Sequence, residues 1–419
     1  MNAFGRVWLW LRSSLWFVPT LLIAASMVAA VLLVEGTGNV EDALVERWPR
    51  LFGAGADGSR EMLAAIATSM ITVAGVVFSI TIVSLSLAAT QYSPRVLRNF
   101  MRDRPTQVVL GVFVGNFAYC LLVLRTVRGG DDATFIPALA VLGAMVYGFA
   151  AIAMLVYFIH HVAQSIQAST IVTRIHDDAA ASVDTMFPEK VGEPASQARV
   201  DLRLPDTWTP VPAQRNGYVM AVDGDPLLDL ATEVGRVVRL RVGTGDFVVA
   251  GAVLAELEGR AEVPADLADR VRRLVTIGRQ RTPEQDPRFG VQQLVDIAVK
   301  ALSPGINDPT TACMCLDQLG ALVVRLSDRH MPDPHRLADG QLRAVVPVPD
   351  YGGFVHLAFG AVIHHSRGDP QVLHGVLQQL AAAEARVRDP ARRRALAGSA
   401  TAVVRQLGRP GLSVDARLV

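Results

Sequence analysis

The main pattern along the chain is a change from long apolar stretches to mixed sequence near residue 165. Before that point, four runs contain no Asp, Glu, Lys or Arg and approach or exceed the ~20 residues that a helix needs to cross a bilayer core. They cover about residues 15–34, 62–89, 108–124 and 135–159. We therefore predict that residues 1–165 form a transmembrane domain of four helices.

The first run could be a signal peptide, because Arg6 and Arg12 precede it. Its apolar length exceeds that of a usual signal-peptide core, so we predict an uncleaved membrane anchor. Positive charge near the ends of the runs predicts their orientation. The loop between the second and third runs carries four arginines: Arg95, Arg98, Arg102 and Arg104. We therefore expect a multi-pass protein of the inner (plasma) membrane, with both termini and this loop on the cytoplasmic side.

The second run has a face of small and hydroxyl residues. Spacings of three, four and seven place six residues on one side of a helix: Thr68, Thr72, Gly75, Ser79, Ser86 and Thr90. Small residues allow close packing between membrane helices, and hydroxyls bond across them. In an oligomer, the same face is a candidate pore lining. Both interpretations, packing face and pore, remain open at this level.

The third run contains a small-residue contact motif, Gly111 and Gly115, followed by the polar Asn116. We predict that this motif packs against a neighbouring helix and that Asn116 faces protein rather than lipid. The runs lack interior charged residues, which argues against a proton relay or an ion-coupled carrier built on buried charge. Adjacent His160 and His161 point about 100° apart on a helix, so interfacial anchoring is favoured over metal binding.

The remainder of the chain is predicted to be a cytoplasmic α+β region. Residues 166–216 are interpreted as a helical connector and linker, residues 217–260 as a small β module, and residues 264–419 as a helical domain. In the β module, Val238, Leu240 and Val242 alternate with arginines, which is typical of a strand. The stretch GTGDFVVAGAVLAELE resembles the second half of a biotinyl/lipoyl-type module. No lysine lies between Lys190 and Lys300, which excludes a swinging-arm role.

Three blocks of sequence resemble the domain of unknown function 2254 (DUF2254) family of predicted bacterial membrane proteins. They are SMITVAGVVFSITIVSLSLAATQYSPRVLRNFMRDRPTQVVLGVFVGNFAYCLLVLRTV, YFIHHVAQSIQAS and QDPRFGVQQLVDIAVKALSPGINDPTTACMCLDQLG. The resemblance implies a membrane location and the same four-span layout. It implies no established activity and no catalytic residues.

Candidate chemistry is sparse. The formal net charge of +1 does not indicate a nucleic-acid partner, and three cysteines cannot form a disulfide framework. The chain has no G-x-S-x-G, Walker A or G-x-G-x-x-G motif, so we predict no enzyme, no cofactor and no metal. In SPGINDP, Asn307 and Asp308 are interpreted as turn and helix-cap residues, with Pro309 opening the next helix.

Our leading functional hypothesis is an oligomeric channel-like or transport-associated protein, embedded in the lipid bilayer and regulated or assembled through its cytoplasmic domain. The alternative is a membrane-anchored scaffold or sensor that binds a cytoplasmic protein partner. A membrane enzyme acting near the inner interface is the third and weakest hypothesis.

Overall fold

The computed structural model describes residues 16–36, 55–91, 103–129, 135–187, 204–282 and 285–408 of the 419-residue chain. The chain divides into two compact units: the first ends at Gln167 and the second begins at Ala168. Each unit is described separately.

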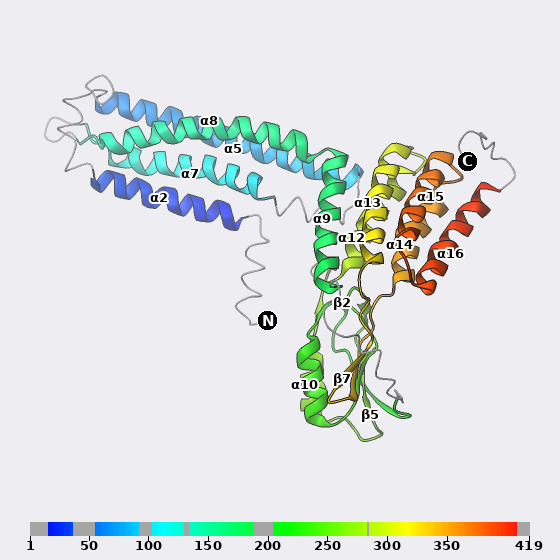
Figure 1. Cartoon of the computed structure of the whole chain (residues 1–419). Coiled ribbons are helices and arrows are strands. Elements are labelled where there is room, and N and C mark those ends of the chain that lie inside the picture. The colour runs from blue at the N-terminus through cyan, green and yellow to red at the C-terminus, as the bar shows by residue number, and fades with distance from the viewer. Residues whose placement is uncertain are drawn as a thin grey trace. The chain divides into compact units, whose positions relative to one another are not determined.

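Within its described residues, the first unit contains four helices that run alongside one another (Figure 1). They are α2 (Phe17–Gly36), α5 (Ala56–Gln91), α7 (Arg104–Thr126) and α8 (Ala138–Ser165). All four are long and apolar enough to cross a membrane, and each overlaps one of the predicted runs. The most central is α7, which contacts the other three helices and has half of its most apolar segment buried. Helix α5 begins at Ala56 rather than residue 62 and has 36 residues.

The second unit has a helical part that begins with α9 (Ala168–Met186). A break at residues 166–167 separates α9 from α8. Instead of acting only as a connector, α9 packs on α12 and α13. The other helices of this part are α12 (Pro287–Ala301), α13 (Pro309–Ser327), α14 (Tyr351–His365), α15 (Pro370–Glu384) and α16 (Pro390–Leu407).

Asp-Pro pairs begin four of these helices. Proline fixes a helical φ at the first turn, where its missing N–H leaves no hydrogen bond unmade, and the preceding aspartate can cap the free backbone N–H groups. Asp308, Asp369 and Asp389 each accept such bonds at the start of α13, α15 and α16. Asp286 precedes α12 without making a side-chain cap bond.

In the described residues, the rest of the second unit forms two sheets. The five-stranded sheet has the order β1-β5-β3-β8-β7, and the three-stranded sheet has the order β4-β2-β6. The β3–β8 pair is parallel, and the other paired strands of the two sheets are antiparallel. The strands are β1 (Trp208–Pro212), β2 (Gly217–Val222), β3 (Val238–Leu240), β4 (Phe247–Val248), β5 (Val253–Glu258), β6 (Val275–Gly278), β7 (His335–Ala338) and β8 (Gln341–Val345).

This arrangement corrects three of the assignments predicted from sequence. The predicted linker contributes β1, and the predicted helical domain contributes β6, β7 and β8 in addition to its helices. The predicted β module contains a helix, α10 (Gly224–Val234), whose buried Leu227, Leu230 and Ala231 follow helical spacing. A biotinyl/lipoyl-type module is therefore not confirmed. A further short helix, α11 (Ala265–Arg273), precedes β6.

The chain crosses between the helical part and the sheets several times. After α13 it leaves the helices to form β7 and β8 and then returns as α14. One connector joins α13 to β7 and the other joins β8 to α14. Both contain the pattern X-Pro-X-Pro, at residues 331–334 and 346–349. The backbone N–H of Val346 donates to the carbonyl oxygen of Pro334 at 2.9 Å, so the connectors are joined where they reach the sheet.

Candidate functional site

The small and hydroxyl face of α5 points away from the other helices of its own unit. Leu63, Ala67, Met70, Ala74 and Val77 form the buried side of α5. Since successive helical residues are about 100° apart, the six predicted residues lie on the opposite side. All six are exposed: Thr68, Thr72, Gly75, Ser79, Ser86 and Thr90. Among the described residues, this face is therefore not buried against the other helices of the first unit.

The hydroxyl groups on this face differ in their hydrogen bonding. Thr72 Oγ1 donates to the carbonyl oxygen of Thr68 at 2.7 Å, and Thr90 Oγ1 donates to that of Ser86 at 3.0 Å. Among the residues described, no hydrogen bond is found for the hydroxyls of Thr68, Ser79 and Ser86. A β-carbon placed on Gly75 would meet nothing within 4 Å. The face thus presents open space and unsatisfied hydroxyls.

The glycines of α7 lie against α2. A β-carbon on Gly111 would come within 2.6 Å of Leu22 Cδ1 and 3.0 Å of Pro19 Cα. On Gly115 it would come within 2.6 Å of Ser26 Oγ and 2.8 Å of Tyr147 OH. The two helices approach closely because these positions lack side chains.

Asn116 is fully buried inside the first unit. Its Oδ1 accepts from Cys120 Sγ at 3.4 Å, and its Nδ2 has no hydrogen-bond partner among the described residues. Nearby, Ser26 Oγ and Tyr147 OH share a hydrogen bond of 2.9 Å, and Tyr119 OH donates to the carbonyl oxygen of Ala140 at 2.8 Å. Asn116 therefore faces protein, within a small polar region at the centre of the helices.

Of the predicted arginine loop, only Arg104 falls within the described residues, as the exposed first residue of α7; Arg95, Arg98 and Arg102 lie outside them. Beside it, Asp103 caps α7 and lies 2.8 Å from His161 Nε2. His161 stacks on Tyr157 with ring centroids 5.8 Å apart. These contacts join the start of α7 to the end of α8.

The SPGINDP segment has the geometry of a cap. Asn307 has a φ of 51°, in the left-handed region that asparagine tolerates. Asp308 accepts from the backbone N–H of Thr311 at 3.0 Å and from its hydroxyl at 2.5 Å. These bonds lower the pKa of Asp308, the hydroxyl bond having the largest effect. In the described parts of the chain, no group of three His, Cys, Asp or Glu side chains could hold a metal ion.

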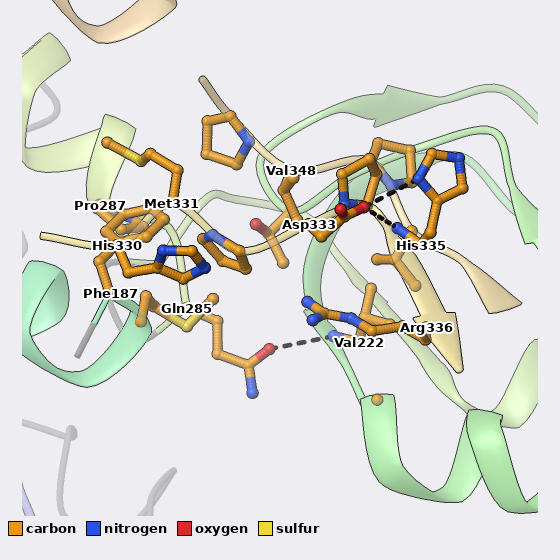
Figure 2. A pocket seen from close by; sticks show the side chains of 18 of the residues that line it. Phe187, Val222, Gln285, Pro287, His330, Met331, Asp333, His335, Arg336 and Val348 are labelled. Carbon is orange, nitrogen blue, oxygen red and sulfur yellow. Dashed lines mark hydrogen bonds and ion pairs between the residues drawn. The ribbon is translucent and has the colours of Figure 1, made fainter. Parts of the chain in front are cut away.

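A pocket of about 660 Å³ lies in the second unit, between the helical part and the sheets (Figure 2). The end of α9, the start of α10 and the two X-Pro-X-Pro connectors line it. Each proline fixes its own φ and holds the preceding residue extended, so the connectors are stiff walls. Sequence reasoning missed this pocket. Its only signal was the repeated proline spacing, at residues 332 and 334 and again at 347 and 349.

Polar side chains reach into this pocket from different elements. Asp333 accepts the backbone N–H of His335 at 2.8 Å and lies 2.9 Å from His335 Nδ1. The backbone bond is the largest cause that lowers the pKa of Asp333, and the charge of Arg336 adds to it. Gln285 Oε1 accepts from the backbone N–H of Val222 at 3.1 Å. Within the described residues, no hydrogen bond or ion pair engages the half-buried Arg336 guanidinium.

Four membrane-length helices joined to a mixed helical and stranded unit define a multi-span membrane protein. The family model described as "Predicted membrane protein (DUF2254)" matches residues 12–382, and the chain belongs to this family. The chain is 35% identical over 405 residues to uncharacterized protein Rv1290c of Mycobacterium tuberculosis and to uncharacterized protein Mb1321c of Mycobacterium bovis. Each comparison covers 94% of this chain and 76% of the relative. No solved structure gives a significant match.

Proposed function

We propose that this membrane protein is an oligomeric, channel-like or transport-associated protein in which α5 of each copy faces a common axis. The observation that carries the proposal is the exposed face of α5. Its six small or hydroxyl residues lie opposite the side that packs within the protomer. A face made for contact with neighbouring helices of the same chain would be buried instead.

The physical argument concerns the hydroxyls of Thr68, Ser79 and Ser86. Within hydrocarbon, a polar group without a partner is unfavourable, so it is satisfied by another helix or by water. Other copies around an axis would supply the neighbouring helices, and a water-filled pore would supply the water. With 36 residues, α5 is about 54 Å long, beyond the ~30 Å core, so it tilts or extends past the membrane.

The proposed orientation places both termini and the second unit on the cytoplasmic side of the inner membrane. Arg6, Arg12 and the arginines between α5 and α7 support it, since short cytoplasmic loops are rich in Lys and Arg. In a symmetric oligomer, these loops would surround the inner mouth of the axis. The second unit then serves as the regulatory or assembly part.

Flux through liposomes tests the proposal. Purified protein is reconstituted and the passage of small ions is measured for the wild type and for Ser79→Leu and Ser86→Leu. Both substitutions add apolar bulk to the exposed face of α5 and are expected to reduce the flux. Val156→Leu, on the exposed side of α8, is the matched control and is expected to leave it unchanged. The absence of flux in every tested salt, with a lipid-filled or closed axis, would contradict the proposal.

A membrane-anchored sensor or scaffold is the second candidate function, and the pocket of the second unit favours it. In that case the spans anchor the protein, while the second unit binds a partner. The location of the contacts between copies separates the two candidates: contacts confined to the second unit support a scaffold, and contacts along α5 support a channel.

A further inference from the structure

We propose that the pocket of the second unit, between its helical part and its sheets, binds a small organic anion. The anion is either a carboxylate or a phosphate ester, and it carries an apolar body. Nothing in the family assignment names such a site. The inference does not depend on a pore, because it rests only on residues of the second unit.

The first argument is charge. Five charged or titratable residues line the pocket: Asp225, His330, Asp333, His335 and Arg336. The carboxylate of Asp333 is already engaged by His335, and Asp225 is exposed in the first turn of α10. The charge of Arg336 acts on Asp333 at longer range, but its guanidinium points into the pocket without a hydrogen bond or ion pair among the described residues (Figure 2).

The second argument is the balance of hydrogen-bond donors and acceptors. Gln285, which lines the pocket, uses its Oε1 to accept from the N–H of Val222, and no hydrogen bond is found for its Nε2 among the described residues (Figure 2). Arg336 adds a planar fork of N–H groups that matches the two oxygens of a carboxylate or phosphate. Arg336 and Gln285 therefore both carry N–H groups that could donate to an oxyanion in the pocket.

The third argument is the size and the walls. At about 660 Å³ the pocket lies within the range of ~300–1,000 Å³ usual for small-molecule sites. Phe187, Leu228, Met331, Val346 and Val348 line it together with the connector prolines. Inorganic phosphate would occupy only the neighbourhood of Arg336 and leave these apolar walls in water. A ligand with an apolar body covers them, and its burial adds to affinity.

The experiment measures binding to the full-length protein in phosphatidylcholine nanodiscs by calorimetry, with empty nanodiscs as the blank. The probes are phenyl phosphate, phenol and inorganic phosphate, which separate the contributions of the anion and the apolar body. Phenyl phosphate is expected to bind at least about tenfold more tightly than either of the others. Arg336→Gln is expected to raise its Kd at least about tenfold, equivalent to ~1.4 kcal/mol. The same substitution is expected to leave phenol binding unchanged.

Arg260→Gln is the matched control, because it removes the same charge from an exposed position outside the pocket lining. If Arg336→Gln lowers the melting temperature, Val348→Trp, which fills the pocket, provides the second test and is expected to abolish phenyl phosphate binding. Failure of phenyl phosphate to bind at millimolar concentration would overturn the proposal. Equal losses in Arg336→Gln and Arg260→Gln would also overturn it, as would undiminished binding to a correctly folded Val348→Trp.

The source of the anion is separated by lipid composition. Repeating the titration in nanodiscs that contain phosphatidylglycerol tests competition from a lipid phosphate. If phosphatidylglycerol weakens the binding of phenyl phosphate to the wild type, and if this weakening is absent in Arg336→Gln, the site is assigned to a lipid headgroup. Equal binding in both nanodiscs assigns it to a soluble anion.

Discussion

Replacing Gly115 by alanine is expected to destabilise the first unit, because overpacking a tight contact costs about 1–3 kcal/mol before any gain in helix propensity is counted. A β-carbon there would lie 2.6 Å from Ser26 Oγ and 2.8 Å from Tyr147 OH, closer than real β-carbons approach. These hydroxyls hydrogen-bond to each other at 2.9 Å, so the new methyl group pushes apart a bond between α2 and α8. Bonds between membrane helices average about 0.6 kcal/mol. The higher helix propensity of alanine offsets about 0.5–1 kcal/mol.

Gly75→Ala is the matched control for this prediction. Its β-carbon would meet no atom within 4 Å, so only the gain of about 0.5–1 kcal/mol in helix propensity remains. The two variants should therefore differ by roughly 2 kcal/mol in unfolding free energy, with Gly115→Ala the less stable. The assay is denaturation by SDS in mixed micelles, on protein kept monomeric and followed by circular dichroism.

Two results would refute this reasoning. The first is a Gly115→Ala variant as stable as the wild type, which would mean that α2 and α7 do not approach as closely as described. The second is equal destabilisation by Gly75→Ala in monomeric protein, which would mean that the exposed face of α5 packs within its own protomer. Destabilisation by Gly75→Ala confined to the oligomer would instead support contact between copies.

Three further predictions concern single residues. Ser79→Cys should form a disulfide-linked dimer on mild oxidation in liposomes, visible on a non-reducing gel, whereas Val156→Cys on α8 should not; monomer alone for both variants would count against an α5 interface. Asp308→Ala should cost about 0.5–2 kcal/mol of stability at neutral pH through loss of the α13 cap, measured by thermal melting. Folding lowers the pKa of Asp308 from 3.8, so the stability difference between wild type and variant is full above pH 3.8. It should disappear as the pH falls through the pKa that Asp308 has in the folded protein, and a stability difference that does not change with pH would contradict this reasoning. Asp184→Asn weakens the two bonds that the carboxylate accepts from Arg325 of α13 and the 2.7 Å bond from Arg329, just beyond α13. At about 0.2–1 kcal/mol for each of the two pairs, the loss should be about 0.4–2 kcal/mol, less at high salt, by the same assay.

The sequence predicted elements whose pattern is long or strictly periodic. Four uncharged runs predicted four helices, and the alternation at Val238 and Leu240 predicted β3, in which both residues are buried. Strands β7 and β8 escaped prediction because their side chains are mostly half-buried, so no apolar alternation marks them. Helix α10 escaped because Gly224 and Pro226 at its start suggest a turn, and only three buried residues mark its helical face.

The candidate sites show the same limit. Composition and spacing identified the small and hydroxyl face of α5, but the side of α5 that packs on other helices depends on tertiary contacts absent from local sequence. The apolar Leu63 and Ala67 carry that contact, and Ser79 points away from it. The proline spacing gave no hint of the residues inside the pocket, because Gln285 and Arg336 come from distant segments that meet only when the sheets and helices have formed.

The excursion of the chain from α13 into β7 and β8 has a consequence for synthesis on the ribosome. Strand β3 is central in its sheet, yet its parallel partner is completed only when Val345 has been added. At ordinary elongation rates, the interval between the two strands is on the order of 10 s. During that time, one side of β3 is an open edge that can pair with another nascent chain. Truncations that stop short of β8 would make this transient exposure permanent, and they should aggregate even though α12 and α13 are complete.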